Sequence, residues 1–205
     1  MIESAQQTQR GRVQELAGAM FAERGFDGVT MAEIADAAGV ARATVFNYFG
    51  SKYALIEAIT ETVLAFYRDM LDEALADVDR TTPDLIRWLF EEMGEGIESQ
   101  RQFFRSIFRE IARIQLGLDE GSVAQRASNE TADRVKRLVE RGQARGELSD
   151  AFDSATLAGA FTSLANGTII AWLYDDQTQP LVARMRDAAE VLLSPVAVTA
   201  KGDAT

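Results

Sequence analysis

The sequence predicts an all-α fold in which a small N-terminal three-helix unit precedes a larger helical bundle. Apolar residues recur at helical spacing from about residue 6 to about residue 193, and no segment shows the alternating pattern that is typical of strands. Only three prolines interrupt the chain, at positions 83, 180 and 195, and the first two stand where helices are expected to begin.

The periodicity and the helix-ending residues together predict nine helical segments, which divide into two domains. We expect a first domain over 1–51, a larger helical domain over 52–195, and a flexible tail over 196–205. The expected helices are 7–24, 31–38, 41–49, 51–76, 83–98, 101–117, 122–145, 154–174 and 180–193.

Local signals fix the ends of the first helices. Gly25 follows the apolar face of the first helix and is expected to end it. Thr30 and Glu33 have the spacing of a capping box, in which two side chains satisfy two otherwise unpaired backbone amides at a helix start. Gly39 then ends the second helix, and Ser51 is expected to cap the long helix that follows.

Composition lowers the expectation of an enzyme. The 205 residues include no cysteine and no histidine, which removes thiolate and imidazole metal ligands, cysteine nucleophiles and the usual general base. We therefore expect no catalytic residue, no metal site and no cofactor. A carboxylate-based enzyme stays open as an alternative, although the adjacent Asp175 and Asp176 are expected to point apart at a helix end.

Charge and hydropathy indicate a cytoplasmic protein with a local, rather than a global, surface for nucleic acid. The formal net charge is −11, but residues 1–52 hold five basic and six acidic side chains, so the acidic excess lies beyond them. No uninterrupted apolar run approaches 18 residues, and the N-terminus has no apolar signal core. We expect no membrane association, and the lack of cysteine fits a reducing cytoplasm.

The segment around Gly39 has the pattern of a helix-turn-helix, two short helices joined by a tight turn. Val40, Val45, Phe46 and Phe49 are expected to pack the second helix against the first. The side chains left for solvent suit a DNA major groove, since Arg pairs with guanine, Asn with adenine, and a Thr methyl group contacts thymine. These candidate DNA-binding residues are Arg42, Ala43, Thr44, Asn47 and Tyr48.

Two further residues are candidates for contacts with DNA phosphates. Lys52 lies in the first turn of the next helix, where its ammonium group and the helix's free amides could bind the same anion. Thr30 could do the same at the start of the second helix.

The stretch GFDGVTMAEIADAAGVARATVFNYFGSKYALIEAI resembles the N-terminal region of TetR-family regulators, from about Val13 to about Ile59. The resemblance implies that residues 41–48 enter the major groove, that Thr44, Asn47 and Tyr48 contact DNA, and that Lys52 contacts a phosphate. Phe46 stands where the family often has Tyr, which removes a phenolic phosphate contact. Gly50 stands where Pro is frequent, which we expect to loosen the turn without changing the pattern.

The resemblance further implies a dimer with a ligand cavity in the larger domain. Aromatic residues concentrate there, and an apolar cavity with a few polar groups is typical of a small-molecule site. The candidate ligand-binding residues are Trp88, Phe104, Phe108 and Trp172. Two amphipathic helices, 122–145 and 154–174, are expected to form a four-helix homodimer interface.

Together these features predict a DNA-binding regulator, in the simplest case a repressor that a small apolar or amphipathic ligand releases from a palindromic double-stranded operator. An activator, or a regulator whose ligand acts as corepressor, has the same sequence features. A helical dimer that no longer binds DNA is a further alternative.

Overall fold

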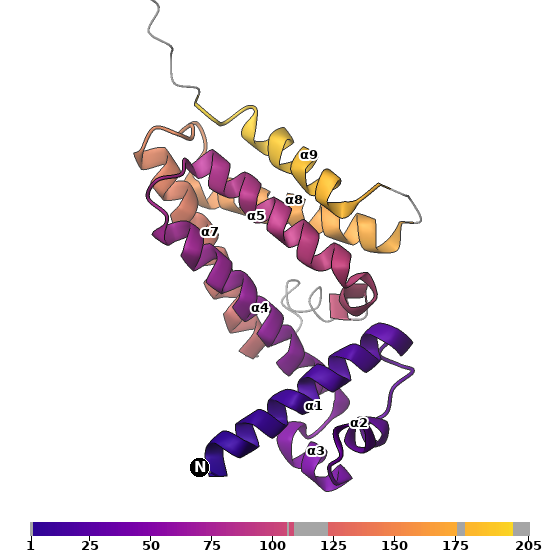
Figure 1. Ribbon diagram of the computed structural model, residues 1–205. Coiled ribbons are helices and arrows are strands. Elements are labelled where there is room, and N and C mark those ends of the chain that lie inside the picture. Colours follow the sequence, from indigo (N-terminus) through magenta and orange to yellow (C-terminus); the bar gives the residue numbers. More distant parts are fainter. Residues whose placement is uncertain (1, 106, 109–122, 176–178, 199–205) are drawn as a thin grey trace, which may run out of the picture. The chain divides into compact units, whose positions relative to one another are not determined.

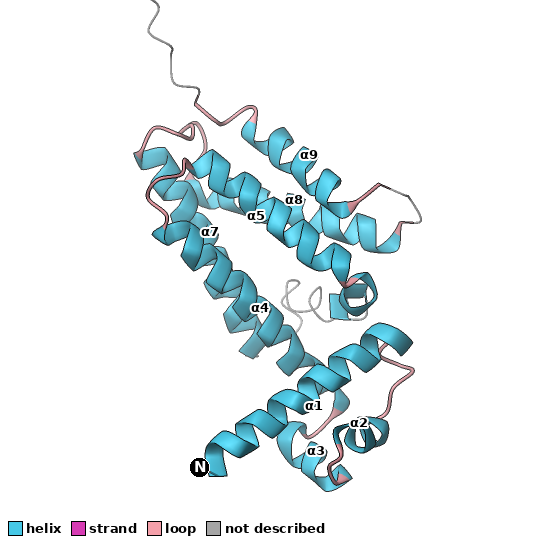
Figure 2. Cartoon of the chain, viewed as in Figure 1, coloured by secondary structure: helices cyan, strands magenta, loops and turns pink. Residues whose placement is uncertain are grey.

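The computed structural model describes residues 2–105, 107–108, 123–175 and 179–198 (Figure 1). The described residues outside loops and turns are helical, apart from one isolated antiparallel bridge between Leu148 and Ala197 (Figure 2). The predicted all-α fold is therefore confirmed for this part of the chain. The chain forms two compact units, one built from residues 1–65 and 100–128, the other from residues 66–99 and 129–205.

The observed helices agree with the predicted ones to within a few residues, except at the N-terminus, where the first helix begins five residues early. The expected helix 101–117 is helical at 101–105 and 107–108, and its remaining residues lie outside the described ones. The labelled helices are α1 (Ile2–Arg24), α2 (Met31–Ala38), α3 (Arg42–Phe49), α4 (Lys52–Ala76), α5 (Thr82–Ser99), α7 (Val123–Ala144), α8 (Ser154–Tyr174) and α9 (Leu181–Leu193).

The first unit contains a compact cluster of α1, α2 and α3, in which each of the three helices contacts the other two. Its core is apolar because each helix presents a buried stripe at helical spacing. In α1 this stripe includes Val13, Ala17 and Phe21, all with no exposed surface, and Val45 of α3 is equally buried.

Glycines end α2 and α3 in the conformations that these turns need. Gly39 has φ 67° and ψ 33°, and its N–H donates to the carbonyls of Ala35 and Asp36. Gly50 has φ 74°, a value that the proline ring forbids, since that ring holds φ near −65°. Glycine at position 50 therefore gives a different turn from the proline that is frequent there in TetR-like sequences. The order of helices around this turn is still the predicted one, with α3 ending at Phe49 and α4 beginning at Lys52.

The second unit is a helical bundle in which α9 packs against α5 and α8 (Figure 1). Gly94 of α5 makes a close approach possible, because a β-carbon at this position would lie 3.0 Å from the Cα of Val182. Residues 196–198, at the start of the expected flexible tail, are ordered against residues 147–149: Val196 is buried, and its carbonyl accepts a hydrogen bond from the N–H of Ser149. Residues 199–205 lie outside the described ones.

Candidate nucleic-acid interface

The start of α2 is held by the predicted capping box. The backbone N–H of Glu33 donates to the Thr30 hydroxyl oxygen over 3.3 Å, and the backbone N–H of Thr30 donates to the Glu33 carboxylate over 2.8 Å. The Thr30 hydroxyl also donates to this carboxylate over 2.7 Å. Arg24 donates to the same carboxylate over 2.6 Å. The bond from the Thr30 hydroxyl, then that from Arg24, then that from the Thr30 N–H lower the pKa of Glu33 to about 2. The anionic carboxylate thus occupies the amino end of α2 in the free protein.

Helix α3 divides into a buried face and an exposed face. Val45 and Phe49 are buried against the rest of the helical cluster, whereas Arg42, Ala43 and Asn47 are exposed. Thr44 and Tyr48 are half-buried at the border between the two faces. The candidate base-reading residues therefore lie on one accessible helix, at the spacing that a groove-binding helix needs.

Phe46 lies on the exposed face, and its expected role in packing α3 is wrong. The ring is 49% exposed and shares a stripe with Arg42, one helical turn earlier. The physical reason is the 100° step of the helix: once Val45 and Phe49 point inward, position 46 lies about 80° to the side of the buried face, where solvent reaches its ring.

Lys52 is tied to the loop between α1 and α2. Its ammonium group donates to the carbonyls of Phe26 and Val29 over 2.8 and 2.9 Å, and it lies 4.2 Å from the centre of the Phe26 ring. An ammonium group carries three hydrogens, so these two bonds leave one for a phosphate. Sequence patterns gave no sign of this contact, because the partners are backbone carbonyls 23 and 26 residues away.

The last turn of α3 contacts the first part of α1. The Tyr48 hydroxyl donates to the side-chain oxygen Oε1 of Gln9 over 2.7 Å, and the guanidinium carbon of Arg10 lies 5.1 Å from the centre of the Phe49 ring. Sequence reasoning missed Gln9, because a glutamine early in a helix carries no signal of a partner 39 residues away.

The four candidate ligand-binding residues have different environments. Phe104 and Phe108, one helical turn apart in the first unit, are 7% and 5% exposed. Trp172 of the second unit is 5% exposed, and its indole N–H donates to the carbonyl of Gln179 over 3.1 Å. Trp88, also in the second unit, is half-buried. That these four residues line one cavity stays a prediction.

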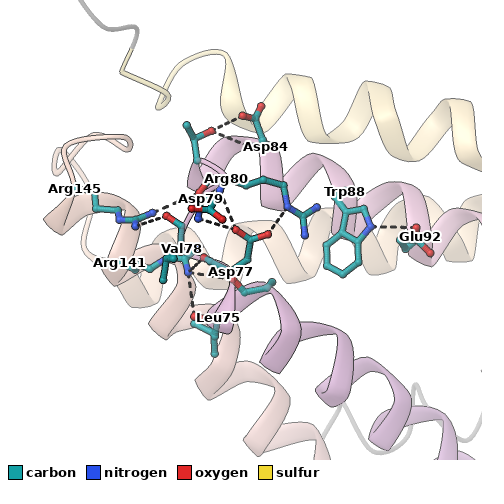
Figure 3. A network of polar contacts seen from close by, with 12 residues as sticks. Leu75, Asp77, Val78, Asp79, Arg80, Asp84, Trp88, Glu92, Arg141 and Arg145 are labelled. Carbon is teal, nitrogen blue, oxygen red and sulfur yellow. Dashed lines mark hydrogen bonds and ion pairs between the residues drawn. The ribbon is translucent and has the colours of Figure 1, made fainter.

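Trp88 belongs to a polar network at the end of α4 (Figure 3). Its indole N–H donates to the carboxylate of Glu92 over 3.1 Å, and the Arg80 guanidinium carbon lies 4.7 Å from its ring centre. Nearby, one nitrogen of Arg141 donates to three backbone carbonyls at the C-terminal end of α4 and just after it. Arginine donors at a helix C-terminus satisfy carbonyls that the helix itself leaves unpaired, so this network fixes the end of α4.

Comparison with known proteins agrees with this architecture. Residues 15–59, which cover most of α1, all of α2 and α3 and the start of α4, match the family model described as "Bacterial regulatory proteins, tetR family". The regulatory protein RaaS of Mycobacterium tuberculosis is 29% identical over 95% of this chain and 85% of its own length. The repressor KstR2 of the same species is 35% identical over 95 residues, which are 44% of this chain and 45% of KstR2.

The similarity extends to solved structures across both units. FadR of Thermus thermophilus, a TetR-family repressor solved with lauroyl-CoA, has a TM-score of 0.66 at 24% identity, covering 96% of this chain and 98% of FadR. Likeness at this identity shows the shared fold, while the family model shows the shared helix-turn-helix. The helix-turn-helix of this chain, residues 15–59, is therefore that of the TetR family of regulatory proteins.

Proposed function

We propose that this chain is a dimeric transcriptional regulator that reads operator DNA with α3 and releases it when a small apolar or amphipathic ligand binds. The observation that carries the proposal is the face of α3, where Arg42, Ala43 and Asn47 are exposed while Val45 and Phe49 hold the helix to its support. In this proposal Arg42 and Asn47 donate to base edges, and Thr44 offers a methyl group to thymine.

Phosphate contacts complete the proposed interface. Lys52 keeps one ammonium hydrogen for a phosphate. Thr30 is the second proposed contact, and its hydroxyl would exchange its bond with the Glu33 carboxylate for one with the phosphate. Tyr48 lies in the last turn of α3, beyond the residues proposed to read bases. Contacts of this kind set the position of the protein on the duplex, while the α3 contacts supply the sequence preference.

Dimerisation is proposed from the composition of α8. This helix carries no charged residue, and by length and composition alone it could cross a membrane, yet only 39% of its most apolar window is buried. Its buried face packs in the bundle as a core helix does, with Leu157, Phe161 and Ile169 at most 7% exposed. We therefore infer that a second copy of the chain covers the remaining apolar surface, and that the protein works in the cytoplasm rather than in a membrane.

The proposed interface has an apolar centre and a charged margin. Gly159 and Gly167 lie in open space on α8, and Ile170 and Tyr174 are 38% and 53% exposed. At the other end of α8, the Ser154 hydroxyl donates to Glu140 of α7, whose exposed side chains are mainly charged. We propose that α8 supplies most of the apolar contact and that α7 lies at the margin.

Oligomeric state is measured by light scattering coupled to size exclusion. The wild-type protein is expected at twice the 22.5 kDa of one chain. Gly167→Arg should give the monomer, because the long cationic side chain cannot be buried against a second α8. Gly96→Arg is the matched control, since Gly96 is also an exposed helical glycine in open space. A dimeric Gly167→Arg protein would contradict the α8 interface.

The ligand class is proposed from the aromatic residues and the relatives. Phe104, Phe108 and Trp172 offer large apolar surfaces, and FadR of T. thermophilus was solved with lauroyl-CoA. KstR2 of M. tuberculosis is described as a ketosteroid regulator. Both descriptions fit an amphipathic molecule with a large apolar part.

The test of DNA binding is an affinity measurement on a duplex selected from a random pool by the wild-type protein. Asn47→Ala is expected to weaken binding roughly 5- to 150-fold for each half-site and to relax the preference at one base pair of each half-site, as for the loss of one good base contact per subunit. Asn129→Ala, at an exposed site outside α3, should bind like the wild type. Failure of the wild-type protein to select any sequence would contradict the proposal.

The direction of regulation follows from the same assay with lauroyl-CoA present. Weaker operator binding supports the repressor, and tighter binding supports a corepressor-type regulator. A ligand shifts binding only through its different affinities for the two conformations of the protein.

A further inference from the structure

The hydrogen bond between Tyr48 and Gln9 joins the last turn of the proposed recognition helix to α1. Tyr48 is half-buried, whereas the Gln9 side chain is exposed beside it. The packing of Arg10 over the Phe49 ring gives a second contact between the same two segments. Two neighbouring contacts therefore hold residues 9 and 10 of α1 next to the end of α3.

The direction of this hydrogen bond limits what Tyr48 can bind. A tyrosine hydroxyl has one hydrogen, and in Tyr48 that hydrogen points to Gln9 Oε1 over 2.7 Å. The Tyr48 oxygen then offers only lone pairs to its surroundings. A phosphate diester has only acceptor oxygens, so Tyr48 cannot donate to it while this bond is intact.

Gln9 holds the donors that Tyr48 lacks. A carboxamide has two N–H hydrogens on Nε2, and no acceptor for them is present among the residues that the structure describes. The bond to Tyr48 engages the carboxamide through its oxygen, and Nε2 stays available on an exposed side chain. Fixing a polar side chain before binding reduces the entropy lost when it meets its partner.

We propose that Gln9 contacts the operator by donating a hydrogen bond from Nε2 to a backbone phosphate oxygen, and that Tyr48 acts mainly as its positioning residue. The inference rests on the proposed function and extends the DNA interface to α1. A phosphate is the expected partner because Gln9 lies on α1, outside the helix that is proposed to read base edges. Arg10, which is exposed, adds positive charge beside the same phosphate.

The test measures operator affinity by fluorescence anisotropy for the full-length wild type, Gln9→Ala, Gln9→Glu, Tyr48→Phe and the double variant Gln9→Ala/Tyr48→Phe. Gln9→Ala should weaken binding about five- to tenfold for each half-site of the operator, the effect of one hydrogen bond per subunit. Gln9→Glu keeps an acceptor for the Tyr48 hydroxyl but removes both donors and adds a negative charge, so it should weaken binding at least as much. The double variant should bind like Gln9→Ala, because Tyr48 acts through Gln9.

A chemical probe of the DNA locates the contact. Single phosphates of the selected duplex are replaced by neutral methylphosphonates, and affinity is measured for wild type and Gln9→Ala. One position in each half-site should weaken binding of the wild type and have little effect on Gln9→Ala. The control Gln14→Ala changes a half-buried glutamine elsewhere on α1 and should retain the wild-type profile.

Three results would overturn the inference while leaving the proposed function intact. They are wild-type affinity of Gln9→Ala, wild-type affinity of Gln9→Glu, and additive losses in the double variant, which would mean that Tyr48 contacts DNA independently. Failure of the wild-type protein to select a duplex would overturn the proposed function and the inference together. Circular dichroism melting of each variant separates a lost contact from a lost fold.

Discussion

Lys52 gives two predictions that can be tested separately, because its ammonium group donates two hydrogen bonds within the protein and is proposed to donate a third to DNA. Two of its hydrogens bond the carbonyls of Phe26 and Val29, and the Phe26 ring lies 4.2 Å away. Lys52→Met keeps most of the side-chain volume and removes the charge and all three donors. The variant therefore tests a structural role and a DNA-binding role in one protein.

The structural cost follows from these contacts. A hydrogen bond from a charged group contributes about 1.5–3 kcal/mol, and a cation–π contact adds about 0.5–1 kcal/mol at a solvent-accessible site. Lys52 is half-buried, so water recovers part of this loss, and we expect Lys52→Met to destabilise the helix-turn-helix segment by about 2–4 kcal/mol. Amide hydrogen exchange in α2 and α3 should accelerate roughly 30- to 700-fold.

Hydrogen exchange is the right assay because both tryptophans lie in the second unit, so their fluorescence does not report on α2 and α3. Lys136→Met is the matched control: Lys136 is exposed and pairs with Glu140 over 3.4 Å, a contact worth at most about 0.5 kcal/mol. Unchanged protection of α2 and α3 in Lys52→Met would refute the structural reasoning.

The third hydrogen of Lys52 gives the second readout. If it meets a phosphate, Lys52→Met should reduce the slope of log affinity against log salt by about 1.8, which is about 0.9 for each subunit of the dimer, and the loss should be similar on all DNA sequences. An unchanged salt slope would show that the ammonium group serves the protein alone.

The remaining predictions concern stability. Hydrogen bonds from Thr30 and then Arg24 lower the pKa of Glu33 to about 2. The ionised carboxylate therefore stabilises the fold above pH 4.5, and this stabilisation is lost as the pH falls toward 2. In acid titrations Glu33→Gln should be less stable than the wild type near pH 6 and equally stable near pH 2. Gly142→Ala places a β-carbon 2.8 Å from Leu148 Cδ1 and should cost about 1–3 kcal/mol, seen as a lower midpoint in urea, whereas a wild-type midpoint would contradict the close packing. In Gly39→Ala the added β-carbon meets no neighbouring atom, but alanine must adopt φ 67°. This backbone strain alone should lower the free energy of unfolding by about 1 kcal/mol. An unchanged urea midpoint would show that the turn adapts.

The helix ends were predictable because their signals are local. Thr30 and Glu33 form their capping box within four residues, and Gly39 takes the left-handed conformation that its place in the turn predicts. The Ser51 hydroxyl accepts the N–H of Ala54, as expected of a residue that caps α4. Such contacts depend on a few neighbouring residues, so the sequence alone contains enough information to place them.

The environments of single side chains were less predictable. Phe46 was expected in the core and is half exposed, because the burial of Val45 and Phe49 decides which face of α3 turns inward. Trp88 was chosen as an apolar lining residue, yet it lies under the Arg80 guanidinium and bonds Glu92. An aromatic residue at helical spacing can serve either role, and only its neighbours in space decide between them.

By itself, the sequence determined the helical class, the positions of the helices and the identity of the polar side chains on α3, since periodicity and capping are encoded within a few turns of chain. Tertiary structure decided which groups bond the side chains of Tyr48, near the end of α3, and Lys52, at the start of α4. Lys52 bonds carbonyls of a distant loop, and Tyr48 commits its only hydroxyl hydrogen to Gln9. Hydrogen bonds of 2.7–2.9 Å depend on the folded positions of residues 23 to 39 apart in the chain, and no local pattern specifies those positions.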